Sequence, residues 1–296
     1  MTGRLAFLCA AILATGCSSS HPDSAAPSPA SGLRVIVTIS TFESFARAVG
    51  GDRIALSSLV PIGASPEDYQ PAPADIEKLH DADLLVENGV GLETWLQRTI
   101  DNAKNANLDI VVATRGLPVK NGNPHLWMDP ELARGYVRTI RDAFIAQDPA
   151  GKAVYERNAA AYDAKLVALE RDIRAQIATI PPDSRSMIVF HNAWQYYDDR
   201  FGLRTVGVLE LSPGQEPNPQ YIANLINLAR SQHVRAVFAE PEYSPKLVET
   251  LAQSAGIATV QDLYDDSIGS DPRVQNYEEM LRYDTATIVK ALGGKG

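Results

Sequence analysis

Short apolar runs alternate with segments of helical periodicity in the first half of the chain. Runs of about four to seven residues rich in Val, Ile and Leu are typical of buried strands, whereas apolar residues three and four apart are typical of helices. We therefore predict strands at residues 34–39, 54–60, 83–86 and 110–113, and helices at 42–49, 74–82 and 92–103. This alternation favours a parallel sheet with helices packed on its faces.

The same alternation returns in the second half of the chain. It predicts strands at residues 186–190, 205–209, 236–239 and 258–263, and helices at 194–200, 219–231, 245–255 and 277–292. Two such series indicate the α/β fold class, with two lobes of mostly parallel sheet flanked by helices.

The middle of the chain is helical only. A helix at 131–146 is followed by helical periodicity over 152–180, with neither Gly nor Pro inside and Pro181-Pro182 directly after it. One helix of that length would be roughly 40 Å long at about 1.5 Å per residue. We interpret it as a backbone helix that joins the lobes; the alternative is two helices that meet near Tyr162-Asp163. The predicted boundaries are an N-terminal lobe at 33–148, a linking helix at 149–182 and a C-terminal lobe at 183–296.

The first residues have the pattern of a secretory signal. Arg4 precedes an apolar run over 5–14, and small residues follow up to Gly16-Cys17, which predicts a signal peptide at 1–16. The run is too short to cross a bilayer as a helix; an uncleaved N-terminal anchor is the alternative. Residues 17–32 are rich in Ser, Pro and Ala, a composition typical of a flexible tether.

The cysteines refine this prediction. The segment 14–17, Ala-Thr-Gly-Cys, resembles the lipobox of bacterial lipoproteins, although Leu13 stands one place earlier than usual. The resemblance implies that Cys17 becomes the lipid-bearing first residue of an extracytoplasmic, membrane-anchored protein. The other cysteine, Cys9, would be removed with the signal peptide, so no disulfide is expected.

Charge argues against one class of partner. The formal net charge is −9 and the sequence contains no basic cluster, so nucleic acid is not expected as a partner. An acidic body is compatible with a cationic ligand.

Candidate chemistry comes from polar residues that directly follow predicted strands. In open α/β sheets, ligands bind beyond the carboxyl ends of the strands. This rule selects one histidine and four carboxylates: Glu67, His191, Glu240, Asp265 and Asp266. A second histidine, His125, lies just before the predicted helix at 131–146. Neutral imidazole and carboxylate suit first-row divalent ions, and the absence of thiols disfavours a soft-metal or iron–sulfur site.

Five segments, in order along the chain, resemble signatures of one family, the substrate-binding proteins of zinc, manganese and iron ABC importers. They are residues 61–75, 87–96, 123–130, 191–203 and 240–246. The resemblance covers essentially the whole body. It implies a non-enzymatic protein that captures a divalent ion between two lobes and delivers it to a cognate ABC permease in the membrane.

The resemblance also implies a ligand set of one residue from each of four loops, two per lobe. The matching positions are Glu67, His125, His191 and Asp266, with Asp265 as the alternative to Asp266. Glu67 is a departure, because the family normally has His there. Glu240 and Glu242 are interpreted as partners of the ligands. The count of two His and two carboxylates resembles the manganese and iron members, while zinc remains possible because it binds N/O sites more tightly than manganese.

Two other classes of function use similar features. A metal-dependent hydrolase would keep an open coordination position for water, and the chain has no His-Glu-x-x-His segment. A binding protein for an organic ligand on a similar fold would have a larger pocket lined by aromatic residues.

Overall fold

The structure is a computed structural model that describes residues 32–212, 214–269 and 271–295, all of which belong to one compact unit. The predicted signal peptide, Cys17 and nearly all of the predicted tether lie outside the described residues.

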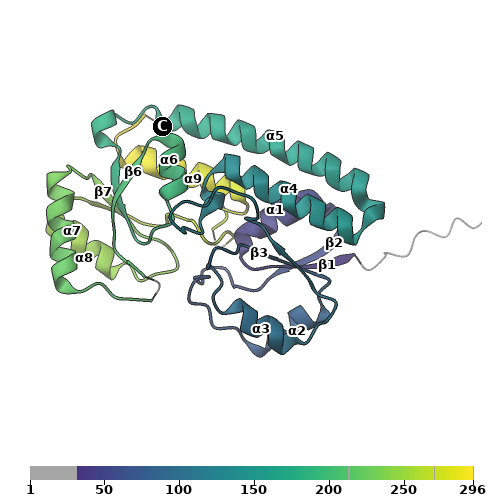
Figure 1. Ribbon diagram of the computed structural model, residues 1–296. Coiled ribbons are helices and arrows are strands. Elements are labelled where there is room, and N and C mark those ends of the chain that lie inside the picture. Colours follow the sequence, from purple (N-terminus) through teal and green to yellow (C-terminus); the bar gives the residue numbers. More distant parts are fainter. Residues whose placement is uncertain (1–31, 213, 270, 296) are drawn as a thin grey trace, which may run out of the picture. The chain divides into compact units, whose positions relative to one another are not determined.

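The first lobe is built on a parallel sheet of four strands: β1 (Leu33–Val37), β2 (Ile54–Ser58), β3 (Leu84–Glu87) and β4 (Asp109–Val112), in the order β2-β1-β3-β4. Helix α1 (Ser40–Gly50) and helix α4 (Pro130–Gln147) lie on one face, and α2 (Pro73–Asp81) and α3 (Leu96–Ala103) on the other (Figure 1). In β1 every residue from Val35 onward is buried, and in β3 every residue except Glu87 is buried. This is expected for a sheet covered on both faces.

The second lobe repeats this arrangement. Strands β5 (Ser186–Val189), β6 (Arg204–Val208), β7 (Ala236–Phe238) and β8 (Ala258–Val260) form a parallel sheet in the order β6-β5-β7-β8. Helices α6 (Gln195–Phe201), α7 (Pro219–Ser231) and α8 (Lys246–Ala255) connect these strands. In both sheets the first strand lies between the second and the third, so each sheet has one point where the strand order reverses.

A single helix, α5 (Lys152–Ile177), connects the two halves of the chain (Figure 1). Its buried residues recur at intervals of three and four along one face: Tyr155, Ala159, Tyr162, Leu166, Leu169, Ile173 and Ile177. This continuous stripe packs against α1 and α4 of the first lobe and against α6 and α9 (Tyr277–Ala291) of the second. The prediction of one long helix is therefore confirmed, and the alternative of two helices is wrong.

The last helix, α9, belongs to the second lobe and also contacts the first. Although α9 follows the strands of the second lobe, Tyr277 packs its ring 4.8 Å from that of Phe45 in α1. The Tyr277 backbone N–H donates to Ser44 Oγ, and Tyr162 in α5 donates to the Glu278 carboxylate. One hydrophobic core therefore runs through both lobes. The predicted lobe boundaries stay a prediction.

Some element ends differ from the sequence prediction, for local reasons. Helix α3 begins at Leu96 rather than at residue 92, because the Glu93 carboxylate accepts hydrogen bonds from the backbone of Asn88 and Gly89 and holds a turn there. Strand β8 ends at Val260 rather than at residue 263, since Asp262 adopts a left-handed conformation with φ of 60°.

Candidate metal site

His191 lies where the strand order of the second sheet reverses. It follows β5 after one residue, and β5 pairs with β7 through Ile188 and Val237. Three residues beyond this pair, His191 faces Glu240. The His191 Nδ1 atom lies 2.6 Å from Glu240 Oε2, and the backbone N–H of His191 donates to Oε1 of the same carboxylate. Glu240 thus favours the His191 tautomer that has its proton on Nδ1 and presents Nε2 to the site.

His125 is oriented in the same way by an amide. It precedes the short helix at Leu126–Met128, and Asn123 Oδ1 accepts hydrogen bonds from both the His125 backbone N–H and Nδ1. The Asn123 Nδ2 group donates to the backbone oxygen of Asn192, which fixes which amide atom faces the ring. Because the amide oxygen is an acceptor only, Nδ1 carries the proton and Nε2 is left as a potential metal ligand.

Asp266 belongs to the loop after β8, but the first lobe holds this loop in place. Thr41 donates from its hydroxyl to the backbone oxygen of Asp266, and Trp127 donates from Nε1 to that of Asp265. The Ile268 backbone N–H donates to Ser40 Oγ. Both carboxylate oxygens of Asp266 are buried and have no hydrogen-bond partner. Side chains of the first lobe therefore hold in place a loop of the second lobe that supplies the Asp266 carboxylate.

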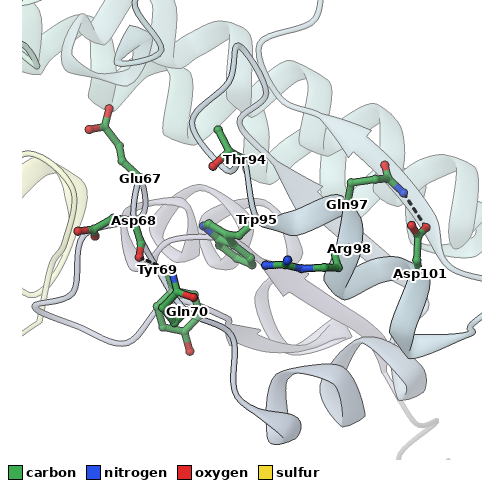
Figure 2. Close-up of a pocket in the computed structure, with 9 residues that line it drawn as sticks. All are labelled: Glu67, Asp68, Tyr69, Gln70, Thr94, Trp95, Gln97, Arg98 and Asp101. Atoms are coloured by element: carbon green, nitrogen blue, oxygen red, sulfur yellow. Dashed lines mark hydrogen bonds between the residues drawn. The ribbon is translucent and has the colours of Figure 1, made fainter. Parts of the chain in front are cut away.

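Glu67 lies in the loop between β2 and α2. The loop is bent where the Ala64 N–H donates to the Pro61 oxygen, and Trp95 Nε1 donates to the Pro66 oxygen. A groove beside this loop is lined by Glu67 itself together with Tyr69 and Trp95, and the Glu67 carboxylate points away from those two rings (Figure 2). Its side chain is 15% exposed.

The four predicted side chains come together around one point. The Nε2 atoms of His125 and His191 lie 3.2 Å apart. Asp266 Oδ1 is 3.8 Å from His125 Nε2, and Oδ2 is 3.9 Å from His191 Nε2. Glu67 Oε1 is 3.9 Å from His125 Nε2. His125, His191 and Asp266 are buried and could hold a metal ion together; Glu67 lies at the edge of this group.

Asp265 has a different environment from its neighbour. Its Oδ2 lies 3.8 Å from His191 Nδ1, on the side of the ring that faces Glu240. His191, Glu240 and Asp265 form a second group with metal-ligating atoms close together. Because Asp266 alone of the two carboxylates lies near both Nε2 atoms, the geometry favours it over Asp265 at the centre of the site.

Burial dominates the electrostatics of the site. Burial, followed by the charge of His191, lowers the pKa of His125 well below its usual value. Burial also lowers the pKa of His191, but the charges of Asp265 and Asp266 outweigh it and raise that pKa. Burial, followed by the charge of Asp265, raises the pKa of Asp266 well above the usual range, and burial raises that of Glu67. Buried carboxylates this close together require a cation or protons between them.

A cavity of about 210 Å³ leads to this group. It is lined by Glu67, His125 and His191 together with residues 121–124, Asn192 and residues 210–212.

Two residues of the site were missed by sequence reasoning. Asn123 orients His125, and its only signal is its place two residues before a histidine. Glu210 follows β6 and satisfies the same rule of strand ends that selected His191.

The other described histidines lie elsewhere. The His80 Nδ1 atom is 2.9 Å from the backbone oxygen of Ala103, between α2 and α3. His233 is exposed after α7 and has a left-handed φ of 50°. Neither lines the cavity.

Two parallel-sheet lobes that bring two imidazoles and several buried carboxylates to one cavity define a two-lobed metal-binding protein. Over residues 35–291 the chain matches the family model described as zinc-uptake complex component A, periplasmic (ZnuA). The chain belongs to this family, and the sequence-based family assignment is confirmed.

Curated relatives carry the names of metal-binding transport proteins. The chain is 31% identical over 287 residues to the manganese-binding lipoprotein MntA of Halalkalibacterium halodurans, with 95% of each chain covered. It is 32% identical over 269 residues to the iron-binding protein YfeA of Yersinia pestis, with 88% and 86% covered. It is 28% identical over 275 residues to the manganese ABC transporter substrate-binding lipoprotein PsaA of Streptococcus anginosus, with 88% and 89% covered.

Solved structures agree with this assignment. The Mn-bound periplasmic metal binding protein from candidatus liberibacter asiaticus superposes with a TM-score of 0.78 at 27% identity, covering 88% of this chain and 99% of that one. Its Cd-bound form superposes with a TM-score of 0.79 over the same shares. The predicted fold class of two parallel-sheet lobes and a long helix is confirmed.

Proposed function

We propose that Glu67, His125, His191 and Asp266 bind one divalent transition-metal ion as cargo. The observation that supports this most strongly is the pair of facing imidazoles. Each ring has its Nδ1 engaged by an acceptor, so each presents an Nε2 lone pair, 3.2 Å from the other. Two nitrogens at this spacing, each about 2.1 Å from one ion, subtend an angle of about 100°, which lies between tetrahedral and octahedral geometry.

The charges of the proposed ligands suit such an ion. With both imidazoles neutral, the carboxylates of Glu67 and Asp266 balance the two positive charges of the cation. A buried ion is stable only when its charge is compensated in this way. Imidazole and carboxylate together suit zinc, manganese and iron, and the general affinity order favours zinc over manganese at any such site.

The role of the protein follows from its family. It captures the ion outside the cytoplasm as the substrate-binding component of an ABC importer, and we propose that it releases the ion to a cognate permease. We also propose that a lipid on Cys17, outside the described residues, anchors it to the membrane, as the lipoprotein names of relatives suggest. Among the described residues, no helix is both long and apolar enough to span a bilayer.

We infer that the ion is carried and not used in catalysis. Two imidazoles and two carboxylates occupy four coordination positions, whereas a catalytic zinc site keeps one open for water. An organic ligand is disfavoured at the two imidazoles, since the cavity there, at about 210 Å³, is below the usual range for such pockets. Metal-loaded protein is expected to show no turnover of ester or peptide substrates.

The test is a titration of metal-free protein with Zn²⁺ and with Mn²⁺ in separate calorimetric experiments. We expect one ion per chain in each case, and one bound transition metal in protein purified from its native compartment. The absence of saturable binding of either ion would contradict the proposal.

A further inference from the structure

Glu210 lines the cavity that leads to the proposed metal site. It comes two residues after the end of β6 in the second lobe, and it lines the cavity together with Glu67, His125 and His191. It does not belong to the groups of metal-ligating atoms found among the described residues. Glu210 therefore lies outside the innermost ligands but on the path to them.

Only one of the two oxygens of the Glu210 carboxylate has a hydrogen-bond partner. Its Oε1 atom accepts a hydrogen bond from the backbone N–H of Gly214 at 2.7 Å, which fixes the side chain within its own loop. Its Oε2 atom is buried and has no hydrogen-bond partner, and the residue is 8% exposed. Burial of a carboxylate oxygen without a hydrogen-bond donor costs free energy. Such an oxygen in a folded protein therefore calls for an explanation, such as the binding of an ion.

The setting of this oxygen is strongly negative. Among the charged groups that act on Glu210, Glu67 and Asp68 of the facing first lobe are negative, and His191 is the positive one. No ion pair of the described residues gives Glu210 a lysine or arginine partner. A cation that enters the cavity would thus meet Glu210 from one lobe and Glu67 from the other.

We propose that Glu210 is an intermediate ligand for the incoming ion: its free oxygen binds the divalent cation within the cavity, before the ion reaches Glu67 and the two imidazoles. The inference deepens the proposed function, on which it rests.

The physical advantage of this arrangement is kinetic. The innermost ligands are almost fully buried, so an ion must lose most of its water before it reaches them. A carboxylate in the cavity replaces part of that water before the ion reaches the imidazoles, and its charge attracts cations. It therefore lowers the barrier between solvent and the innermost ligands, and those ligands determine the affinity for the bound ion.

The experiment compares Glu210→Gln with the parent by stopped-flow mixing of metal-free protein with Zn²⁺ or Mn²⁺ alone. Fluorescence of Trp127 is a built-in reporter, since its ring centroid lies 5.0 Å from that of His125. Gln keeps an oxygen that can accept from Gly214, so the loop retains its hydrogen bond. The matched control is Glu216→Gln, which removes the same charge from an exposed side chain of the same loop.

We expect Glu210→Gln to lower the association rate constant at least about threefold, and to lower the dissociation rate constant by a similar factor, because a group that contacts the ion only on its path affects entry and exit alike. The equilibrium affinity should therefore stay close to that of the parent. The difference should persist in about 0.5 M salt, where the Debye length is about 4 Å, because the effect requires contact with the ion. Glu216→Gln should behave as the parent does.

Three results would overturn the inference while leaving the proposed function intact. The first is an association rate of Glu210→Gln equal to that of the parent. The second is an effect of Glu210→Gln that Glu216→Gln reproduces or that disappears in high salt, since either outcome would indicate a contribution of charge alone. The third is a loss of affinity that arises only from faster dissociation, which would make Glu210 an inner ligand. Failure of the parent itself to bind metal would instead refute the proposed function.

Discussion

The Nε2 atoms of His125 and His191 lie 3.2 Å apart, although 66 positions separate the two residues in the sequence. Each ring is turned toward the other by an acceptor behind it, Asn123 in one case and Glu240 in the other. In the metal-free protein, a proton on one Nε2 can bridge the pair. A metal ion between the rings would take the place of that proton.

Removal of either imidazole should weaken metal binding. For His125→Ala and His191→Ala, we expect the affinity for Zn²⁺ and Mn²⁺ to fall at least about tenfold each, since even loss of a group behind a ligand has an effect of that size. Calorimetric titration measures the change. His233→Asn is the control, because it removes an exposed histidine far from the cavity and Asn tolerates the left-handed backbone there. Parent-like affinity in both alanine variants would rule out the proposed site.

Metal affinity should decrease as the pH falls. The carboxylates around His191 raise its pKa, and burial raises the pKa of Asp266, so protons compete with a metal ion for both groups at higher pH than they would for the free side chains. Burial lowers the pKa of His125, so this ring contributes little. Each displaced proton lowers the apparent affinity about tenfold per pH unit of acidification. Titrations between pH 8 and 6, in buffers of different ionisation enthalpy, count the released protons; a pH-independent affinity would contradict the assignment.

The sequence predicts the fold well because the apolar strands of both sheets are short, buried and regularly separated by helices. The ends of elements depend on contacts that no local pattern contains. Helix α3 starts late because the Glu93 carboxylate binds the turn before it and also accepts from Thr38, 55 positions away. The rule of strand ends similarly selects the loops of the site from sequence alone.

Within those loops, the sequence cannot tell which side chain points inward. Asp265 and Asp266 are adjacent, and their directions depend on hydrogen bonds from Trp127 and Thr41 of the other lobe to their backbone oxygens. Glu210 was overlooked for a related reason. It follows a strand as His191 does, but a glutamate in a loop is usually solvated, and only the folded chain places it in the cavity.

Stability should respond to pH through a carboxyl group outside the site. Burial raises the pKa of Asp198 in α6 to about 7, although the carboxylate accepts a hydrogen bond from the Thr205 backbone. Its folded-state pKa exceeds the unfolded value, so the folded state binds more protons between these two values. The stability that this group contributes is therefore fully present below its unfolded pKa and is lost as the pH rises toward and through about 7.

The variant Asp198→Asn removes this titration. Between pH 5 and 8, we expect the free energy of unfolding of the metal-free variant to decline by about 2–3 kcal/mol less than that of the parent. Urea unfolding at both pH values measures the difference. Asp52→Asn, which changes an exposed aspartate, should keep the parental pH dependence. An identical decline in Asp198→Asn would show that Asp198 does not hold its proton in the folded state.

Membrane attachment should depend on Cys17. If this residue bears the lipid, Cys17→Ser will release soluble protein from cells or leave the precursor unprocessed. Fractionation and the size of the product on a gel distinguish these results from normal anchoring. Cys9→Ser is the control, since it lies within the predicted signal peptide and should be processed and anchored as the parent is. Normal anchoring of the Cys17 variant would refute the lipoprotein prediction for this position.

We expect Glu67 to influence how the proposed site discriminates between metals. It occupies the position at which the family normally has His, and its Oε1 atom lies 3.9 Å from His125 Nε2. A carboxylate oxygen is a harder ligand than an imidazole nitrogen, and it narrows the difference in affinity between zinc and manganese. The general affinity order still favours zinc, so we expect the parent to bind zinc more tightly than manganese.

Three variants test this assignment in competition titrations with both ions. Glu67→His should widen the preference for zinc, because imidazole favours the later metals more strongly. Glu67→Ala should weaken the binding of both ions, since the buried cation loses a ligand and half of its balancing charge. Glu77→Ala, the matched control, removes an exposed carboxylate on α2 and should change neither affinity appreciably. If Glu67→Ala instead binds both ions as tightly as the parent, Glu67 is not a ligand, and water or another carboxylate must complete the coordination shell around His125, His191 and Asp266.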